Sequence, residues 1–492
     1  MCSKILFFII FTSAFFLRLY NLGTNDLWFD EAMSVIISHK FFEDIIPDRQ
    51  PPLYYFLLFY WTKLFGYTEF VLRLLSVIFN LCSILFAYKI TNLLFDRQTS
   101  LILLIIMTFS PFHIWYSQEV RGYTFTTFMI LMNTYFFILA LQEKKNRYWV
   151  FYFLSLVTLP YVNYFALFLF LAQGLCFLFK KHQILFRKWA CCIIFSMIFF
   201  TPWLDIFVRQ TIFATHSSWI PKPSLKSLII TLENFNLGYN AHPFIYKLSH
   251  LFFAPPFILG LFCSFKNIFF SRLLIFSLFL PIGICFFISR IITPIYLDRL
   301  LLPFSIFYFI FLGYGLSKLF KSWLRYTGIT SIMILILLSL NNYFLNYMPS
   351  DLSHHIGLYT KKPIKPILRL IYKDWEENDV IVYTSPSIRA SFIYYLKFHP
   401  NFNNSFKEDY YCISDKEDPY WQTLWKNDDE VITIVNHKIR TYSRIWLISS
   451  SWPRDGTLDE NSIAVREWME KNYKRVFEKW FDGILVGLYE KR

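Results

Sequence analysis

Charged residues are scarce in this sequence: Asp, Glu, Lys and Arg make up 17% of the 492 residues, whereas apolar residues make up 55%. A soluble chain does not carry this much uninterrupted apolar sequence, so the composition indicates a polytopic membrane protein. The formal net charge of +14 does not indicate a nucleic-acid-binding protein, because residues 346–492 contain 21 Lys/Arg and 21 Asp/Glu. The whole excess therefore lies between the apolar runs of residues 1–345, where basic residues are a signal of membrane topology.

Motifs for metals and nucleotides are also lacking. None of the eight cysteines stands in a Cys-x-x-Cys pair or in a Cys/His cluster with metal-ligand spacing. Cys412 is alone in the polar C-terminal part, which excludes an internal disulfide there. The same part has no G-x-G-x-x-G phosphate loop, since residues 452–456 are typical of a turn. The sequence thus identifies no metal site, and it leaves open whether a divalent cation takes part.

Eleven apolar runs are candidate membrane spans. They lie at residues 4–20, 71–94, 99–117, 121–142, 147–160, 162–180, 189–209, 246–265, 270–290, 298–320 and 327–345. The two runs within 147–180 are shorter than the usual ~20 residues, so one long span is the alternative there. Two spans place the basic clusters at 144–147 and 180–188 on the same side of the membrane, as the positive-inside rule requires.

The distribution of charge then predicts the topology. Residues 5–19 lack a small-residue cleavage site, which favours a retained first span over a signal peptide. With the N-terminus inside, the inner segments hold fifteen Lys/Arg against two Asp/Glu, and the outer segments twelve against eleven. This arrangement predicts a cytoplasmic N-terminus and an extracytoplasmic C-terminus. It also gathers four polar stretches on the outer face, at 21–70, 116–123, 210–245 and 290–299.

Two parts of the chain differ from the spans. In the first outer loop, 21–70, apolar residues recur from Asp30 at helical spacing, which predicts a short amphipathic helix in the interface with Asp30 as its cap. Residues 53–65 are apolar but too few to cross, so they favour an interfacial or re-entrant segment.

The second such part, 346–492, alternates strand-like and helix-like patterns and predicts a small α/β domain outside the membrane. Its strands are expected at 380–384, 431–435, 445–449 and 484–489, its helices at 388–398 and 462–472, and a connector at 361–366. The fold class is therefore an α-helical polytopic membrane domain, 1–345, followed by this α/β domain.

Asp30 and Glu31 are the first candidate site residues. One interpretation is that they stabilise a helix N-terminus through the helix dipole. The other is that one of them is a general base for an acceptor hydroxyl at the membrane surface. Since adjacent helical residues point about 100° apart, one carboxylate takes the proton in this hypothesis while the other orients it or holds a cation.

Two arginines on the same predicted face are candidates for binding phosphate. Arg121 follows Glu119 in Tyr-Ser-Gln-Glu-Val-Arg-Gly-Tyr (116–123), and Arg299 follows Asp298. A solvated hairpin with a snorkelling Arg121, and a local charge pair at 298–299, are the structural interpretations. A guanidinium that binds a lipid-linked phosphate and stabilises its charge as a leaving group is the functional one.

These residues also carry a family resemblance. The series R-x-x-x-L…W-F-D-E-A (18–32), P-P-L-Y-Y (51–55) and Y-S-Q-E-V-R-G-Y (116–123) resembles polytopic GT-C glycosyltransferases. The similarity is to the bacterial branch related to dolichyl-phosphate-mannose protein mannosyltransferases and aminoarabinose transferases. The resemblance implies Asp30 as catalytic base with Glu31 in support, and Arg121 as the arginine that binds the carrier phosphate.

Further residues of these motifs complete the predicted site. Glu119, Tyr123 and Tyr54 are supporting residues, and Arg299 and Arg49 are additional phosphate ligands. Relatives often have His or an acid–lysine pair before Pro-Pro-Leu, where this chain has Arg49-Gln50, so a metal site at that position is not expected.

The implied activity is the transfer of a sugar, with inversion, from a polyprenyl-phosphate donor to a hydroxyl of a lipid, glycan or protein acceptor. The implied location is the outer face of the plasma (inner) membrane. An envelope-glycan ligase or polymerase is one alternative, but such enzymes place their chemistry in a large late loop. A transporter of lipid-linked sugars is the other, and it predicts charged residues near the midplane of the spans, which are almost free of them.

Overall fold

The computed structural model describes residues 2–39, 50–178, 183–216, 219–265, 268–349, 352–358, 361–402, 410–412, 428–451 and 457–492. The chain folds into two compact units that interleave along the sequence. The first, here called the helical unit, comprises Met1–Asn21, Arg49–Tyr54 and Arg73–Gly357. The second, here called the sheet unit, comprises Leu22–Asp48, Tyr55–Leu72 and Leu358–Arg492. Most of the first loop thus belongs to the same unit as residues 358–492, here called the C-terminal chain. The sequence prediction assigned this loop to the membrane domain.

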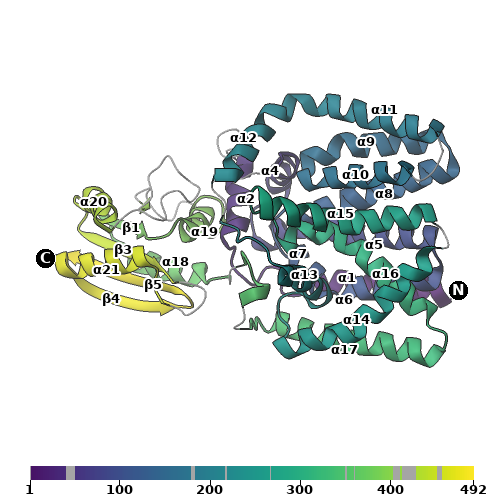
Figure 1. Cartoon of the computed structure of the whole chain (residues 1–492). Helices are drawn as coiled ribbons and strands as arrows, with labels where there is room; N and C mark the ends of the chain where they lie inside the picture. Colours follow the sequence, from purple (N-terminus) through teal and green to yellow (C-terminus); the bar gives the residue numbers. More distant parts are fainter. Residues whose placement is uncertain are drawn as a thin grey trace. The chain divides into compact units, whose positions relative to one another are not determined.

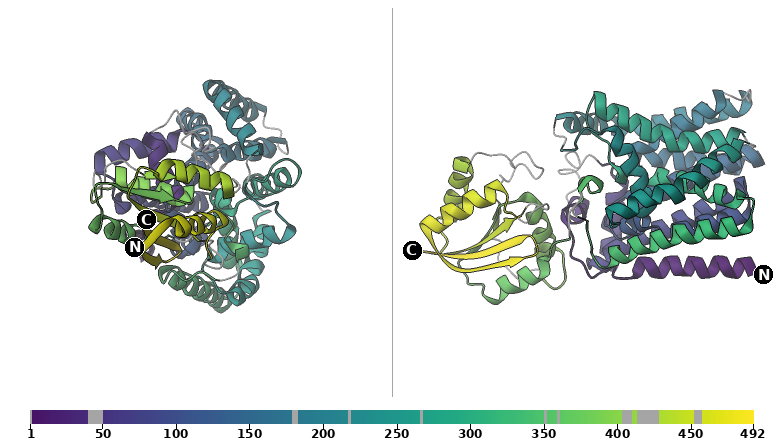
Figure 2. Two further views of the ribbon diagram at one scale, coloured as in Figure 1. Left: turned by 90° about the vertical axis from the view of Figure 1, so that its left-hand side faces the viewer. Right: turned by 60° about the horizontal axis from the view of Figure 1, so that its bottom comes forward.

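Helices make up the helical unit, and the long ones among them run side by side (Figures 1 and 2). They are α1 (Cys2–Leu19), α5 (Glu69–Leu94), α6 (Arg97–Phe109), α7 (Pro111–Ser117), α8 (Tyr123–Glu143), α9 (Asn146–Val162), α10 (Leu167–Leu178), α11 (Gln183–Phe200), α12 (Leu204–His216), α13 (Leu225–Leu237), α14 (Pro243–Ser264), α15 (Ile268–Ile291), α16 (Leu302–Lys318) and α17 (Ser322–Phe344). Short 3₁₀ turns lie at Tyr164–Ala166, Thr201–Trp203, Asp298–Leu301 and Leu352–His354.

Seven helical segments among the described residues are long and apolar enough to cross a membrane, and the bent pair α6–α7 makes an eighth if it counts as one span. The remaining predicted spans correspond to α1, α9 and α10, so a total of eleven stays a prediction. The stretch 147–180 contains two helices, because α9 ends at Val162 and α10 begins only at Leu167. The predicted division into two segments is therefore confirmed, although Pro160 lies inside α9 and the break falls at Asn163.

The α6–α7 bend of 58° is stabilised by a buried arginine. Pro111 has no backbone N–H, so the carbonyl of Met107 loses its normal helical donor. Arg18 of α1 supplies the missing donors: its Nη2 bonds to Met107 O at 2.9 Å and its Nη1 to Thr108 O at 3.0 Å. Its Nε also donates to Asn80 Oδ1 of α5 at 2.6 Å. Arg18 therefore joins α1, α5 and α6 at the α6–α7 bend.

The helix that follows Arg299 is buried along its length. Every residue of α16 from Leu302 to Ser317 is inaccessible to solvent or nearly so. Gly315 lets α14 approach its backbone closely, because a Cβ at Gly315 would lie 1.7 Å from the carbonyl oxygen of Pro256. Close packing of this kind fixes α16, which directly follows the 3₁₀ turn that contains Arg299.

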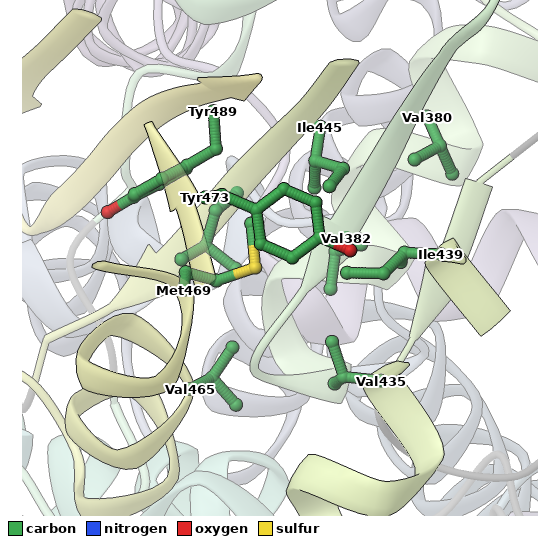
Figure 3. Close-up of a cluster of buried hydrophobic side chains, with 10 residues drawn as sticks. Val380, Val382, Val435, Ile439, Ile445, Val465, Met469, Tyr473 and Tyr489 are labelled. Carbon is green, nitrogen blue, oxygen red and sulfur yellow. The ribbon is translucent and has the colours of Figure 1, made fainter. Parts of the chain in front are cut away.

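Among the described residues, the sheet unit contains a five-stranded sheet in the order β2-β1-β3-β5-β4. Its strands are β1 (Asp379–Tyr383), β2 (Tyr410–Cys412), β3 (Arg444–Ser450), β4 (Tyr473–Phe481) and β5 (Ile484–Lys491). β1 pairs in parallel with β2 and β3, whereas β5 pairs antiparallel with β3 and β4. The helices of the C-terminal chain are α18 (Ile364–Lys373), α19 (Pro386–Lys397), α20 (Asp428–Ile439) and α21 (Glu460–Asn472). Figure 3 shows the apolar core in which Val380 and Ile445 of the sheet meet Val435 of α20 and Val465 of α21.

Most predicted elements of this part are confirmed, and the errors have physical reasons. The strand predicted at 431–435 is wrong, because these residues belong to α20, whose Val435 and Ile439 recur at helical spacing and face the core. The predicted connector at 361–366 includes the start of α18. Pro366 lies in the first turn of that helix, where no backbone N–H is required. β4 was not predicted, because most of its side chains are not buried and its sequence therefore has no apolar run.

Candidate active site

Asp30 and Glu31 lie in the first turn of α2 (Phe29–His39), in the sheet unit. The predicted helix is present, but it begins at Phe29, so Asp30 is a first-turn residue and not the cap. Residues 31–38 are all buried, which is more than the single face expected of an interfacial helix. Asp30 is partly exposed, whereas the Glu31 side chain is 0% exposed. The two neighbouring carboxylates therefore have different environments, and Asp30 is the accessible one.

Glu31 has a cationic partner from the C-terminal chain. Lys361 Nζ lies 3.5 Å from Glu31 Oε2, and the Lys361 side chain is only 17% exposed. The backbone N–H of Trp28 also points to Glu31 Oε2, at an N···O distance of 3.4 Å. That second contact is one half of a capping box, which places Glu31 against the start of α2. The interpretation of residues 361–366 as a connector did not predict that Lys361 pairs with Glu31.

A second buried cluster in the sheet unit surrounds Glu69. Its Oε1 accepts hydrogen bonds from Lys365 Nζ at 2.7 Å and from Tyr395 OH at 2.9 Å, and its Oε2 lies 3.2 Å from His399 Nε2. Burial by itself would lower the pKa of Lys365, but the bonds to Glu69 and Asp26 outweigh it and raise that pKa above its usual value. The cluster therefore holds a charged lysine and its carboxylate together in the interior.

Asp26 caps a helix of the C-terminal chain. Its Oδ2 accepts the backbone N–H groups of Ile364 at 2.6 Å and Lys365 at 2.9 Å, and its Oδ1 lies 3.0 Å from Lys365 Nζ. Two backbone N–H groups at the N-terminus of α18 are thus bonded to a carboxylate that lies 338 residues earlier in the sequence than Ile364. Sequence reasoning did not identify Asp26, Glu69, Lys361 or Lys365, because their partners lie in distant parts of the chain.

The Tyr116–Tyr123 turn belongs to the helical unit and is buried. Arg121 is 8% exposed and Glu119 is 1% exposed, so the interpretation as a solvated hairpin is wrong. Gln118 anchors the turn, because its Nε2 donates to the carbonyls of Arg18 at 2.9 Å and Tyr20 at 2.8 Å. Buried polar groups of this kind are stable only when they are paired, as these are.

Arg121 lies beside two of the predicted supporting residues. Its guanidinium carbon is 6.0 Å from the centre of the Tyr123 ring, in the range of a cation–π contact. Tyr54 packs on the intervening Gly122, where an added Cβ would lie 3.2 Å from Tyr54 Cγ. Glu119 accepts a hydrogen bond from the Trp115 indole at 2.7 Å. The structure therefore brings Tyr54, Glu119, Arg121 and Tyr123 into one buried neighbourhood.

Arg299 is tied to the segment after the last long helix. Its Nη1 donates to Gly357 O at 3.0 Å, and its guanidinium carbon lies 5.6 Å from the centre of the Trp219 ring. Asp298 accepts the backbone N–H of Arg299 at 2.8 Å and the side-chain amide of Asn234 at 2.5 Å.

A chain of hydroxyls connects Asp298 with the Tyr116–Tyr123 turn. Tyr239 donates to the Asp298 carboxylate, and its hydroxyl lies 2.5 Å from that of Tyr116. Asn234 and Asp298 also line a pocket, together with His354. The two stretches that carry Arg121 and Arg299 are thus joined through neutral tyrosines.

Arg49, the third predicted phosphate ligand, lies outside the described residues. The neighbouring Gln50 accepts a hydrogen bond at its carbonyl from Gln210 Nε2, at 3.1 Å. Within the described part of the chain, no group of three or more His, Cys, Asp or Glu side chains is arranged to hold a metal ion.

The resemblance to glycosyltransferases inferred from the motifs is confirmed by a family match and by solved structures that have a similar fold. Residues 49–205 match the family described as dolichyl-phosphate-mannose-protein mannosyltransferase. No curated protein sequence matches the chain significantly.

Solved structures resemble the chain over its whole length. ArnT from Cupriavidus metallidurans in the apo state superposes with a TM-score of 0.63 and 10% identity, over 99% of this chain and 98% of that one. ArnT from the same organism bound to undecaprenyl phosphate gives 0.63 and 11%, over 98% and 97%. AglB from Archaeoglobus fulgidus, in complex with an inhibitory peptide and a dolichol-phosphate, gives 0.52 and 11%, over 100% and 74%. At these identities the likeness establishes the fold.

Proposed function

We propose that this protein is an integral membrane glycosyltransferase that moves a sugar from a polyprenyl-phosphate donor to a hydroxyl acceptor. The observation that carries the proposal is the end-to-end likeness to ArnT, whose structure includes a complex with undecaprenyl phosphate. The family match over residues 49–205 supports the same class of enzyme, since that family is one of mannosyltransferases that use dolichyl-phosphate-mannose.

Asp30 is the general base in this proposal. It is partly exposed in the first turn of α2, whereas Glu31 beside it is buried against Lys361. An acceptor hydroxyl reaches only the accessible carboxylate. As the hydroxyl oxygen bonds to the anomeric carbon, its proton passes to Asp30 and the bond to the donor phosphate breaks on the opposite side. A single displacement of this kind inverts the anomeric centre.

Arg121 is the main phosphate ligand in the proposal, with Arg299 and Arg49 as further cations. Negative charge grows on the phosphate as it leaves, and a fixed guanidinium that is mostly buried stabilises that charge more strongly than a solvated one. The buried turn around Gln118 fixes Arg121 in advance, so little reorganisation accompanies the reaction. Because a lipid phosphate carries the sugar, no nucleotide-binding loop is required.

The proposed site faces the extracytoplasmic side of the plasma membrane. The charge pattern supports this orientation, because the predicted inner segments carry fifteen basic residues against two acidic ones. A donor whose lipid tail stays in the bilayer then presents its sugar and phosphate to residues at the membrane surface. The acceptor is a hydroxyl of a lipid, glycan or protein.

Sugar transfer from synthetic polyprenyl-phosphate sugars, by purified protein in nanodiscs, tests the proposal. Asp30→Asn is expected to lower kcat about 10²- to 10⁴-fold while donor binding is retained, because the general base is lost and the fold is not. Asp205→Asn is the matched control, since Asp205 also lies in the first turn of a helix and its side chain is 71% exposed. Undiminished turnover in Asp30→Asn would remove Asp30 from the mechanism. A wild-type protein inactive with every donor would contradict the function itself.

A further inference from the structure

We infer that Lys361, from the C-terminal chain, is a positioning residue for the candidate catalytic carboxylates of the first loop. The inference rests on the proposed function and assigns the sheet unit a part in it. Lys361 does not touch substrate in this proposal. It acts through Glu31, and Glu31 through the helical turn that carries Asp30.

The burial of Glu31 is the first argument. Its side chain is 0% exposed, and an ionised carboxylate taken out of water needs a compensating cation or hydrogen-bond donors. Lys361 Nζ, at 3.5 Å, is such a cation, and the backbone N–H of Trp28 contributes from the other side at 3.4 Å. Removal of the ammonium group weakens this compensation, which favours either protonation of Glu31 or its movement toward water.

Both alternatives disturb Asp30. The two residues are adjacent in the first turn of α2, and Glu31 is fixed to the residue that precedes the helix. The Asp30 carbonyl accepts a hydrogen bond from Ser34 Oγ at 2.8 Å, so the backbone of this turn is also held from within the helix. Because the two residues share one turn that moves as a unit, a movement that carries Glu31 out of the interior also turns Asp30 away from its direction in the intact protein. Small misplacements of a catalytic group of this kind cost up to about 10²-fold in rate.

The position of Lys361 is itself fixed by the first loop. Lys361 closely precedes α18, and Asp26 caps that helix through the N–H groups of Ile364 and Lys365. Asp26 in turn closely precedes α2, which carries Asp30 in its first turn. Lys365 bridges Asp26 and Glu69, with Nζ–O distances of 3.0 and 2.7 Å. The same short stretch of first loop thus holds both the carboxylates and the backbone from which Lys361 extends.

This arrangement gives the C-terminal domain a specific task. The first loop by itself supplies two adjacent carboxylates with no basic residue between Asn21 and His39. The C-terminal part of the chain supplies an ammonium group 3.5 Å from Glu31, the buried carboxylate, whereas its neighbour Asp30 is partly exposed. We expect that the domain contributes to kcat through this pair.

Lys361→Met, Lys361→Arg, Glu31→Gln and the double variant Lys361→Met/Glu31→Gln test the inference in the sugar-transfer assay. Lys361→Met is expected to lower kcat about tenfold or more with the donor KM nearly unchanged, because the base is misplaced and the phosphate ligands are not. Lys361→Arg is expected to recover most of that loss. The double variant is expected to be no slower than Glu31→Gln alone, since Lys361 acts only through Glu31.

Lys373→Met is the matched control, because Lys373 is exposed at the far end of α18. Thermal unfolding of each variant separates misfolding from misplacement. If Lys361→Met unfolds, the double variant is compared with Glu31→Gln instead, because the double variant removes both members of the ion pair. Equal kcat in the wild type and Lys361→Met, or additive losses in the double variant, overturn the inference alone. Failure of the wild type to transfer sugar overturns the proposed function and this inference with it.

Discussion

The two regions that carry the candidate site residues are buried by different means. In the helical unit, neutral groups help to hold the turn around Arg121: an amide donates to two carbonyls, and two tyrosine hydroxyls bond to one another. In the sheet unit, the first loop is held by charged groups, in the pairs Lys361–Glu31 and Lys365–Glu69. Buried charges lose far more than neutral groups when one partner is removed. The comparison therefore predicts that the first loop is more sensitive to loss of a single side chain than the turn around Arg121.

Glu69→Gln is expected to have the largest effect, because it removes the carboxylate shared by Lys365 and His399. Breaking a buried ion pair costs about 3 kcal/mol of stability, and the change leaves Lys365 with Asp26 alone. Thermal unfolding and hydrogen exchange of α18 and α19 would measure the loss. Glu470→Gln is the control, since its pairs with Arg466 and Arg475 lie at the surface. Equal effects of the two substitutions would contradict a buried network.

Arg121→Gln is expected to have the next largest effect, on activity and not on stability. The loss of one phosphate-binding guanidinium lowers transfer by about 100-fold, and the donor concentration needed for half-saturation rises. Arg209→Gln is the control, because the Arg209 side chain is 63% exposed and its ion pair with Asp205 lies at the surface. Transfer that stays within about twofold of wild type, far from the loss expected of a transition-state ligand, would exclude Arg121 as a phosphate ligand.

Gly122→Ala sharpens the comparison within the helical unit. The new Cβ would lie 3.2 Å from Tyr54 Cγ, which is tighter than ordinary van der Waals contact, so Tyr54 or Arg121 has to shift. We expect about a tenfold loss of transfer, since small displacements at a site reduce the rate more than they reduce stability. Gly283→Ala, where nothing lies within 4 Å of the new Cβ, is expected to have no such effect. Kinetics at saturating donor would separate the two.

The smallest expected effect is a pH dependence in the helical unit. Burial by itself would raise the pKa of Glu233, but hydrogen bonds from His354 and His250 outweigh it and hold that pKa below its ordinary value of 4.5. A carboxyl group whose pKa is lowered by folding stabilises the protein at pH values above its ordinary pKa. That stability is lost as the pH falls through the pKa of the group in the folded protein. The unfolding temperature of the wild type should therefore drop more steeply below pH 4.5 than that of Glu233→Gln. Parallel curves would contradict this role of Glu233.

The sequence predicted the elements well where a local pattern decides them. Apolar runs of about 20 residues become long helices because a bilayer requires that length, and 53–65 forms a helix with those bounds. The buried strands at 380–384, 445–449 and 484–489 follow from their apolar residues. The strand prediction failed at 431–435, because the apolar residues there lie on one face of a helix. It missed β4, because that edge strand is mostly exposed and has no apolar run.

For the candidate site, the sequence by itself determined which residues are chemically able to act: two adjacent carboxylates in a first turn, and arginines in polar stretches between apolar runs. These are local facts, because residue type and spacing fix them. Only the tertiary structure decided which carboxylate is accessible, that Arg121 lies in a buried turn, and that Lys361 pairs with Glu31. The physical reason is that burial and ion pairing depend on segments brought together from distant positions, such as Asp26 and Ile364, 338 residues apart. No local pattern records such a partner.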